Sequence, residues 1–206
     1  FIYYMFFYSH RINSLNSLKE VNKKGGVEID LREYKSDLIL SHDPFSNNFT
    51  YLQDFLPFLD GRNIIANVKS ERIEKKFLEI KDELAPNSDY FFLDSSFSMV
   101  ANFGSLYNFA SRFSEFESIE TTINLLENSL INWLWIDTFT LFPINKKNVS
   151  KINSIKINKC FTSPDLLGRE KQIPEYAKLI RELDLKIDAI CCKNKNINLW
   201  KSFLKN

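Results

Sequence analysis

Two neighbouring runs, Gly25-Gly26-Val27-Glu28-Ile29-Asp30-Leu31-Arg32 and Leu38-Ile39-Leu40-Ser41-His42-Asp43-Pro44, decide the fold of this 206-residue sequence. The first run alternates apolar residues with Glu28 and Asp30, as a buried β-strand does. Residues two apart on a strand point to the same side, so the two carboxylates converge on one spot. Because converging carboxylates repel each other, they are held together most easily around a cation.

The polar segment Glu33–Ser36 separates the two runs. If this segment is a tight reversal, His42 returns beside Val27 and Glu28. A carboxylate pair suited to a metal and a titratable imidazole then share one neighbourhood. An ordinary amphipathic hairpin with solvated acids fits the same pattern, so this stretch alone leaves both interpretations open.

The composition is that of a globular protein, with 44% hydrophobic residues and a formal net charge of +1. The length predicts a single domain over residues 1–206. The balanced charge gives no electrostatic argument for nucleic acid or for an acidic membrane surface. Of the three cysteines, Cys191 and Cys192 are adjacent, which does not indicate a disulfide framework and favours a cytoplasmic location. The apolar run at residues 1–8 is too short to span a bilayer.

Strand-like and helix-like patterns alternate along the chain. Eight strands are predicted, at Ile2–Ser9, Val27–Leu31 with a return arm at Asp37–Leu40, Asn63–Val68, Tyr90–Leu93, Asn108–Phe113, Asn132–Ile136, Ser154–Phe161 and Lys186–Cys191. Helices are predicted at Ser14–Lys23, Tyr51–Leu59, Ser70–Leu84, Met99–Leu106, Ile119–Asn128, Pro174–Leu183 and Asn198–Leu204. The sixth strand is followed only by a thin connection through Pro143 and Lys147, and Thr162–Gln172 is predicted as a polar loop.

This alternation predicts an α/β fold, a compact (β/α)₈ TIM barrel with some short or missing helices. The alternative, an open doubly wound sheet, needs a glycine-rich phosphate loop after the first strand. That position holds His10-Arg11-Ile12-Asn13 and no glycine.

Polar residues close the predicted strands at their carboxyl ends, where barrels carry their chemistry. Both histidines of the chain, His10 and His42, fall there on adjacent strands, and Asn67 and Lys69 end the third. Any one of these residues is more often a solvated strand end than a catalyst. Together the two imidazoles can serve as general base and general acid in one turnover.

These residues resemble the glycerophosphodiester phosphodiesterase family, within the superfamily of phosphatidylinositol-specific phospholipase C-like phosphodiesterases. The family pattern is a His-Arg strand end, a helix opened by Asn-Thr or Asn-Ser, a Glu-x-Asp strand, a His-Asp pair and a Glu-x-Lys strand. This sequence matches it with His10-Arg11, Asn16-Ser17, Glu28-Ile29-Asp30, His42-Asp43 and Asn67-Val68-Lys69. It departs from the pattern at Asn67, which replaces a carboxylate, and at Ile12, which replaces a glycine.

The resemblance implies a barrel that hydrolyses a small-molecule phosphodiester with one divalent cation, Mg²⁺ or Ca²⁺. By position, His10 and His42 are the expected acid–base pair, and Arg11 and Lys69 the expected phosphate ligands. The expected metal ligands are Glu28, Asp30 and Asn67, with one negative charge fewer than the family has. Reaction through a cyclic phosphate, formed by a neighbouring substrate hydroxyl, is the route that the family implies.

Two other functions fit the same residues. Asn67 favours a catalytically weak phosphodiester-binding protein that retains the site. The aromatic segments Tyr90-Phe91-Phe92 and Trp133-Leu134-Trp135 fit a lipid-directed phospholipase, although burial in the core explains them better. The oligomeric state and the substrate alcohols are left open by the sequence.

Overall fold

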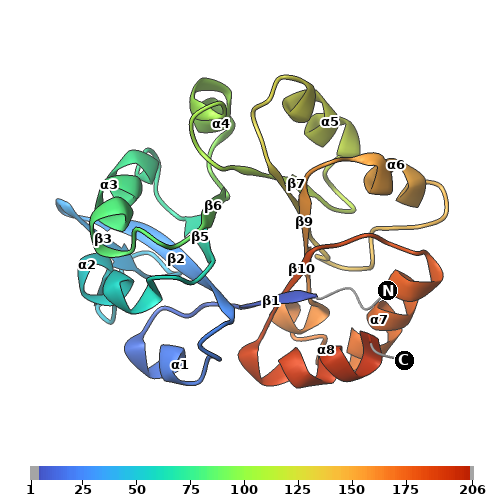
Figure 1. Cartoon of the computed structure of the whole chain (residues 1–206), viewed down its shortest axis with the longest axis horizontal. Coiled ribbons are helices and arrows are strands. Elements are labelled where there is room, and N and C mark those ends of the chain that lie inside the picture. Colours follow the sequence, from blue (N-terminus) through green and yellow to red (C-terminus); the bar gives the residue numbers. More distant parts are fainter. Residues whose placement is uncertain (1–4, 205–206) are drawn as a thin grey trace. The chain divides into compact units, whose positions relative to one another are not determined.

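A computed structural model describes residues 5–204 of the chain (Figure 1). The chain forms two compact units, one of residues 8–109 and the other of the described parts of residues 1–7 and 110–206. The predicted strand Ile2–Ser9 lies partly outside the described residues, and its described part forms β1 (Phe6–Ser9). A single domain over residues 1–206 stays a prediction.

The unit of residues 8–109 is built on parallel strands joined by helices (Figure 1). Strand β2 (Gly26–Tyr34) pairs in parallel with both β1 and β5 (Ile64–Val68), and β5 pairs with β6 (Tyr90–Leu93). The intervening helices are α1 (Leu15–Lys19), α2 (Leu52–Phe55) with the 3₁₀ helix η1 (Leu56–Leu59), α3 (Glu74–Leu84) and α4 (Phe97–Phe103). Residues of β5 that the sequence marks as apolar, such as Ile64 and Ile65, are fully buried.

A tight reversal does follow β2. Strand β3 (Asp37–Leu40) pairs antiparallel with it, Leu31 opposite Leu40 and Tyr34 opposite Asp37, and then pairs with β4 (Thr50–Tyr51). Lys35 turns the chain with a φ of 57°. The register places Ser41 beside Asp30, whose carbonyl accepts the Ser41 N–H at 3.0 Å. His42, which follows Ser41 directly, therefore leaves the hairpin next to the residue beside Asp30, and not beside Val27 and Glu28 as the sequence predicts.

The second unit repeats the alternation. Its parallel strands are β7 (Ala110–Phe113), β8 (Trp133–Ile136), β9 (Asn158–Thr162) and β10 (Ala189–Cys192), in that order. Its helices are α5 (Ile119–Glu127), α6 (Val149–Ser154), α7 (Ile173–Glu182) and α8 (Ile197–Leu204), with 3₁₀ helices η2 (Pro164–Leu167), η3 (Glu170–Gln172) and η4 (Asn194–Asn196). Phe6 joins this unit through an N–H donated to the Asp188 carbonyl.

Three predictions for this unit were wrong. The thin connection after β8 contains α6, which buries Ile152, and the predicted strand Ser154–Phe161 begins only at Asn158. Polar neighbours hide this short helix in the sequence. The predicted polar loop Thr162–Gln172 holds the end of β9 and two 3₁₀ helices, and it buries Asp165.

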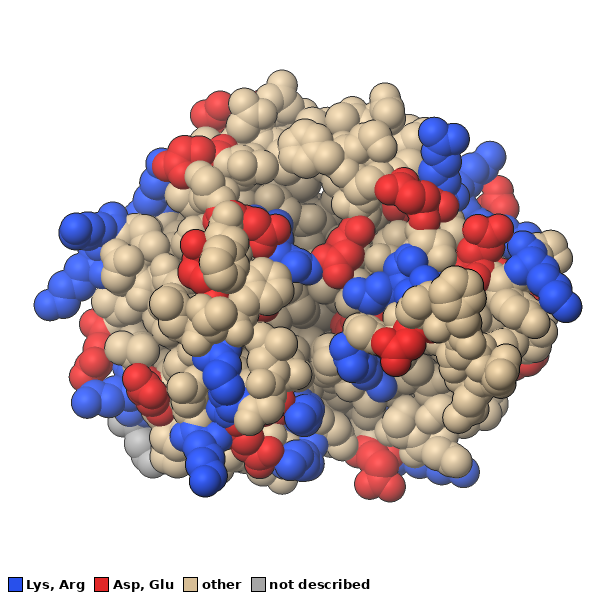
Figure 2. All heavy atoms as spheres, turned by 180° about the vertical axis from the view of Figure 1, so that it is seen from behind, with Lys and Arg blue, Asp and Glu red and all other residues tan. Residues whose placement is uncertain are grey.

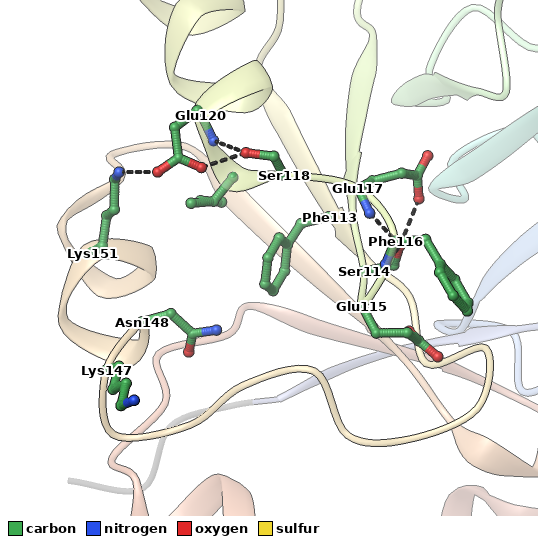
Figure 3. Close-up of a pocket in the computed structure, with 11 residues that line it drawn as sticks. Phe113, Ser114, Glu115, Phe116, Glu117, Ser118, Glu120, Lys147, Asn148 and Lys151 are labelled. Atoms are coloured by element: carbon green, nitrogen blue, oxygen red, sulfur yellow. Dashed lines mark hydrogen bonds and ion pairs between the residues drawn. The ribbon is translucent and has the colours of Figure 1, made fainter.

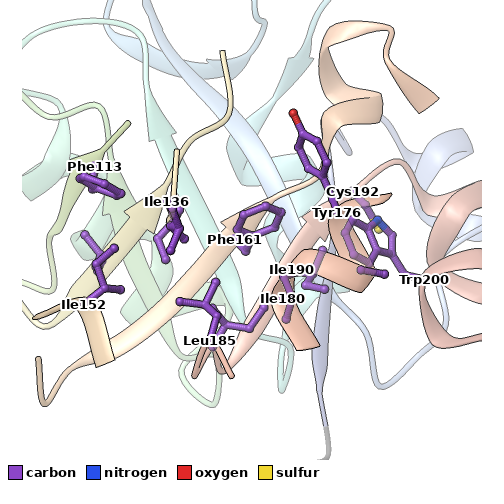
Figure 4. Packing of buried hydrophobic residues seen from close by; sticks show 14 of the residues in the cluster. Phe113, Ile136, Ile152, Phe161, Tyr176, Ile180, Leu185, Ile190, Cys192 and Trp200 are labelled. Atoms are coloured by element: carbon purple, nitrogen blue, oxygen red, sulfur yellow. The ribbon is translucent and has the colours of Figure 1, made fainter. Parts of the chain in front are cut away.

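The core of this unit combines buried residues of its strands with buried residues of the helices α5, α6, α7 and α8 (Figure 4). Trp200 is fully buried against Phe161, with ring centroids 6.3 Å apart, and its Nε1–H donates to Ser163 Oγ at 2.8 Å. The three cysteines are free and buried. Cys192 therefore packs as an apolar residue in this core.

On the face drawn in Figure 2, acidic and basic side chains are interspersed, as the net charge of +1 suggests. Within residues 5–204, the helices are all too short or too polar to cross a membrane. The cytoplasmic location stays a prediction.

Candidate active site

The register of β2 against β5 sets the centre of the site. Asp30 lies opposite Asn67 on the parallel pair, and Glu28 lies two residues earlier on the same side of β2. Glu28 and Asp30 are both fully buried, and Asn67 is nearly so. The Asn67 amide Nδ2–H donates to Glu28 Oε1 at 2.9 Å. The structure thus brings together the three residues predicted as metal ligands.

Glu28 connects this centre to the end of β1. Its Oε2 accepts the backbone N–H of Arg11 at 2.6 Å and lies 3.7 Å from His10 Nε2. Burial raises the pKa of Glu28, and the hydrogen bonds from Arg11 and Asn67 oppose that rise. The Arg11 backbone has a φ of 55°, a left-handed conformation that turns the chain so that its N–H faces the carboxylate.

Asp30 is held by a residue that was not among the predicted site residues. The Asn13 side chain donates from Nδ2 to Asp30 Oδ2 at 2.8 Å and accepts the Asp30 backbone N–H on Oδ1 at 2.9 Å. Burial, and then the charge of Glu28, raise the pKa of Asp30, whereas Asn13 and Lys69 lower it. Asp30 Oδ1 faces Lys69 Nζ at 3.9 Å.

The role of Asn13 corrects the match to Asn16-Ser17. Helix α1 is opened by Ser14, which accepts the Ser17 N–H and forms a reciprocal capping box with it. Asn16 lies inside the helix and is exposed. The signal was present in the sequence, because Asn13-Ser14 is also an Asn-Ser pair and Ser14 stands three residues before Ser17.

His42 lies between an acid and a base. Its Nδ1 is 2.7 Å from Asp43 Oδ1, and its Nε2 is 2.5 Å from Arg11 Nη2. A guanidinium can only donate, so Nε2 is the acceptor and the imidazole proton is on Nδ1, facing Asp43. The bond to His42 lowers the pKa of Asp43. His42 is therefore a neutral imidazole whose Nε2 lone pair is bound to Arg11.

Arg32 and Lys69 complete the arrangement. The Arg32 guanidinium donates to the carbonyls of His42 and Lys69 at 2.8 and 3.1 Å, which ties the segment after β3 to the end of β5. Lys69 Nζ forms an ion pair with Asp94 Oδ2 at 3.2 Å. Ile12 is buried, and its N–H donates to the Glu28 carbonyl at 2.8 Å.

The donor set fits a hard divalent cation. Asp30 Oδ1 and Asn67 Oδ1 are buried oxygens with no hydrogen-bond partner, and oxygens of this kind are the ligands of Mg²⁺ and Ca²⁺. Among residues 5–204, no group of three or more His, Cys, Asp and Glu side chains is placed to hold a metal. The predicted metal site has two carboxylates, Glu28 and Asp30, because Asn67 occupies the position of the third predicted ligand.

A cavity of about 570 Å³ in the second unit is lined by none of the predicted site residues (Figure 3). It lies between the segment after β7 and helix α6, and Glu120 and Lys151 form an ion pair at its edge. Bonds from Lys151 and Ser118 lower the pKa of Glu120 to about 2. Glu115 accepts the Thr140 hydroxyl at 2.8 Å, and Phe116 at the edge of the cavity is largely exposed. This cavity has no counterpart among the predicted site residues.

Comparison with solved structures shows which fold the chain shares. A protein of Agrobacterium tumefaciens strain C58 assigned as a glycerophosphoryl diester phosphodiesterase matches with a TM-score of 0.64 and 11% identity, over 98% of this chain and 99% of that chain. A glycerophosphodiester phosphodiesterase of the same strain matches with a TM-score of 0.62 and 13% identity, over 96% and 99%. No family model and no curated protein matches the sequence.

The likeness extends over nearly the whole chain. With the alternating order of strands and helices, it confirms the predicted α/β class and the compact (β/α)₈ fold. The resemblance to glycerophosphodiester phosphodiesterases, drawn from residues between His10 and Lys69, is thus confirmed at the level of the fold. The low identity is that of a divergent sequence.

Proposed function

We propose that this chain is a phosphoric diester hydrolase, metal-dependent and acting on a glycerophosphodiester-like or sugar-phosphodiester substrate. One observation supports it above the others: Glu28 and Arg11 link the two histidines into one network. Glu28 Oε2 lies near His10 and accepts the Arg11 N–H, and the Arg11 guanidinium bonds to His42. A structural role for the only two histidines does not require this convergence.

The cation, Mg²⁺ or Ca²⁺, would be held by Glu28, Asp30 and Asn67. When bound, it would neutralise charge on the non-bridging oxygens of the phosphate. Arg11 and Lys69 would bind those oxygens from the protein side, as charged hydrogen-bond donors. The ion pairs of Lys69 with Asp94 and Asp30 support this role, because they hold its ammonium group at the strand ends.

The histidines would then divide the proton transfers. His42 is assigned as the base, because Asp43 fixes the proton on Nδ1 and leaves the Nε2 lone pair available once Arg11 turns to the phosphate. The attacking group is water or a neighbouring hydroxyl of the substrate. His10 is assigned as the acid, because the carboxylate of Glu28 at 3.7 Å stabilises a proton on its ring. It would protonate the leaving oxygen.

Two diesters test these roles, one with an alkyl leaving group and one with 4-nitrophenol, which departs without a proton. His42→Ala should lower turnover of both at least about a hundredfold. His10→Ala should lower turnover of the alkyl diester by a similar factor and that of the nitrophenyl diester far less. Asp54→Asn, an exposed acid on α2, is the control. Full activity of His42→Ala on both substrates would refute the proposal.

A second function follows from Asn67. Its amide occupies Glu28 Oε1, and the site has one carboxylate fewer than the family pattern. These features favour a protein that binds phosphodiesters and turns them over weakly or not at all. Phosphate binding measured by calorimetry, together with no metal-stimulated hydrolysis of a nitrophenyl diester, would select this alternative.

A further inference from the structure

Strand β2 carries a third charged residue in line with its two buried carboxylates. Glu28, Asp30 and Arg32 stand two apart, and residues two apart on a strand point to the same side. Arg32 lies opposite Ile39 on the antiparallel partner β3, and the residue before it, Leu31, pairs with the last residue of the parallel partner β5. Its side chain therefore stands where both neighbouring strands give way to the segments of the candidate active site.

The Arg32 guanidinium bonds to the main chain on both sides of β2. Its Nη2 donates to the His42 carbonyl at 2.8 Å, and its Nη1 donates to the Lys69 carbonyl at 3.1 Å. Its Nε makes a longer bond, of 3.4 Å, to the Ser41 carbonyl. Each of the three guanidinium nitrogens thus donates to a carbonyl of a segment that follows β3 or β5.

These two segments carry the base and a phosphate ligand of the proposed reaction. The main chain of β2 holds each of them separately: it accepts the N–H of Ser41 at 3.0 Å on one edge and the N–H of Lys69 at 2.8 Å on the other. The guanidinium of Arg32 bonds to both segments at once. It therefore fixes the position of one segment relative to the other.

A guanidinium suits this role because of its shape. It is planar, and its five N–H donors point in fixed directions, whereas a lysine ammonium is a point charge on a flexible stem. Hydrogen bonds from a charged donor are also stronger than those between neutral groups. Arg32 can therefore set the separation of two carbonyls, and a lysine at this position cannot.

The rate of a reaction at these strand ends depends on that separation. A misplacement of about 1 Å can lower the rate of an enzymatic reaction about a hundredfold. The two carboxylates of β2 have other partners, since Arg11, Asn13 and Asn67 donate to them. Loss of Arg32 should thus disturb the base and the phosphate ligand and leave the candidate metal ligands in place.

We propose that Arg32 is a positioning residue, which sets the distance between the base His42 and the phosphate ligand Lys69. The inference rests on the proposed function. It gives a role to a residue that was not among the expected catalytic, phosphate-binding or metal-binding residues. Arg32 acts through the main chain of the two segments, and its own nitrogens bond to carbonyls and not to the substrate.

Turnover of a 4-nitrophenyl phosphodiester, measured with an excess of divalent cation, tests this role. Arg32→Ala should lower kcat about a hundredfold, with a smaller change in KM. Arg32→Lys should lower kcat about tenfold, because an ammonium group replaces the bonds to two segments by a bond to one. Arg62→Ala is the matched control and should keep the kcat of the wild type. Arg62 also bridges main-chain carbonyls, those of Asn22 and Gly25 at 2.7 and 3.0 Å, but just before the start of β2.

The imidazole spectrum gives a readout that does not require catalysis. The chain has two histidines, so His10→Ala and His42→Ala assign their ring signals in a long-range ¹H–¹⁵N NMR spectrum. At alkaline pH, the His42 signals of the wild type should show a proton on Nδ1. In Arg32→Ala they should change towards an average of the two tautomers, because the His42 main chain is no longer held, and in Arg62→Ala they should stay unchanged.

The two measurements separate this inference from the hydrolase proposal. If the wild type turns over no diester but the His42 signals change in Arg32→Ala, the hydrolase proposal fails and Arg32 still positions His42. Equal losses of kcat in Arg32→Ala and Arg62→Ala would overturn the inference, as would unchanged His42 signals in Arg32→Ala. If Arg32→Ala does not fold, Arg32→Lys decides: wild-type kcat with unchanged His42 signals in that variant would overturn the positioning role.

Discussion

The candidate metal site predicts that a divalent cation stabilises the folded chain. Glu28 and Asp30 are fully buried, and burial raises the pKa of both, so their ionised forms destabilise the folded state at neutral pH. A cation held between them offsets that cost. Because the unfolded chain does not assemble the site, binding shifts the unfolding equilibrium towards the folded state.

The structure sets the size of the effect. Asp30 Oδ1 and Asn67 Oδ1 lack hydrogen-bond partners, and each such buried atom costs about 1–3 kcal/mol. The two together leave about 2–6 kcal/mol for a ligand to recover. At a cation concentration about 100 times Kd, binding contributes about 2.7 kcal/mol, which lies within that range. A chain of this length shifts its Tm by about 2–4 °C per kcal/mol, so the expected rise is about 5–11 °C.

Thermal unfolding followed by circular dichroism measures this shift. The protein is first treated with a chelator and then titrated with CaCl₂ or MgCl₂. Asp30→Asn should abolish the rise in Tm, Asn67→Glu should move it to lower cation concentrations, and Asp54→Asn should behave as the wild type. A rise in Asp30→Asn equal to that of the wild type would refute the site, as would no rise in the wild type with either metal.

Three further predictions concern packing and charge. Trp200→Ala should lower the free energy of unfolding by about 3–5 kcal/mol in a denaturant titration, because it leaves a cavity in the core and removes the hydrogen bond that Trp200 donates to Ser163 (Figure 4). The control, Leu199→Ala, should cost about 0.5 kcal/mol, since Leu199 is 36% exposed. Equal losses in the two variants would contradict the packing of Trp200. In the presence of chelator, the stability of the wild type relative to Glu28→Gln should fall as the pH rises. Because burial raises the pKa of Glu28 in the folded state, protonation of Glu28 stabilises the fold. That contribution is complete below the pKa of the unfolded state and is lost as the pH rises through the pKa of the folded state. If the wild type instead became more stable relative to Glu28→Gln as the pH rose, Glu28 would not be a buried, desolvated carboxyl. Lys151→Ala should move the pKa of Glu120 from about 2 towards 4.5, measured by carboxyl ¹³C NMR, and an unmoved titration would place the ion pair elsewhere.

The sequence predicted the strands of this chain better than its helices. Buried parallel strands read as continuous apolar runs, so Tyr90–Leu93 was placed with its observed limits. The antiparallel strand Asp37–Leu40 was also placed with its observed limits, because three of its four residues are apolar. Helix α6 was missed because only Val149 and Ile152 mark its buried side within a polar segment. Two apolar positions in a helix of six residues are too few to distinguish a helical period from a loop.

The predicted site residues do converge, and their partners were the part that the sequence could not supply. Period-two alternation is sufficient to place Glu28 and Asp30 on one side of a strand. The bond of Arg11 to His42 joins residues 31 positions apart, and it depends on the left-handed backbone at Arg11. Residue type gave no sign of that conformation, because glycine and asparagine are the residues that usually adopt it.

Costs to stability gather at the same strand ends as the proposed chemistry. Arg11 and Asp94 are non-glycine residues with φ of 55° and 62°, and each positions a proposed phosphate ligand, the first its own guanidinium and the second Lys69. Beside them lie two buried acids with raised pKa and two buried oxygens without partners. A fold selected only for stability would replace such groups, so their presence beside the two histidines supports the proposal that these strand ends are a reaction site.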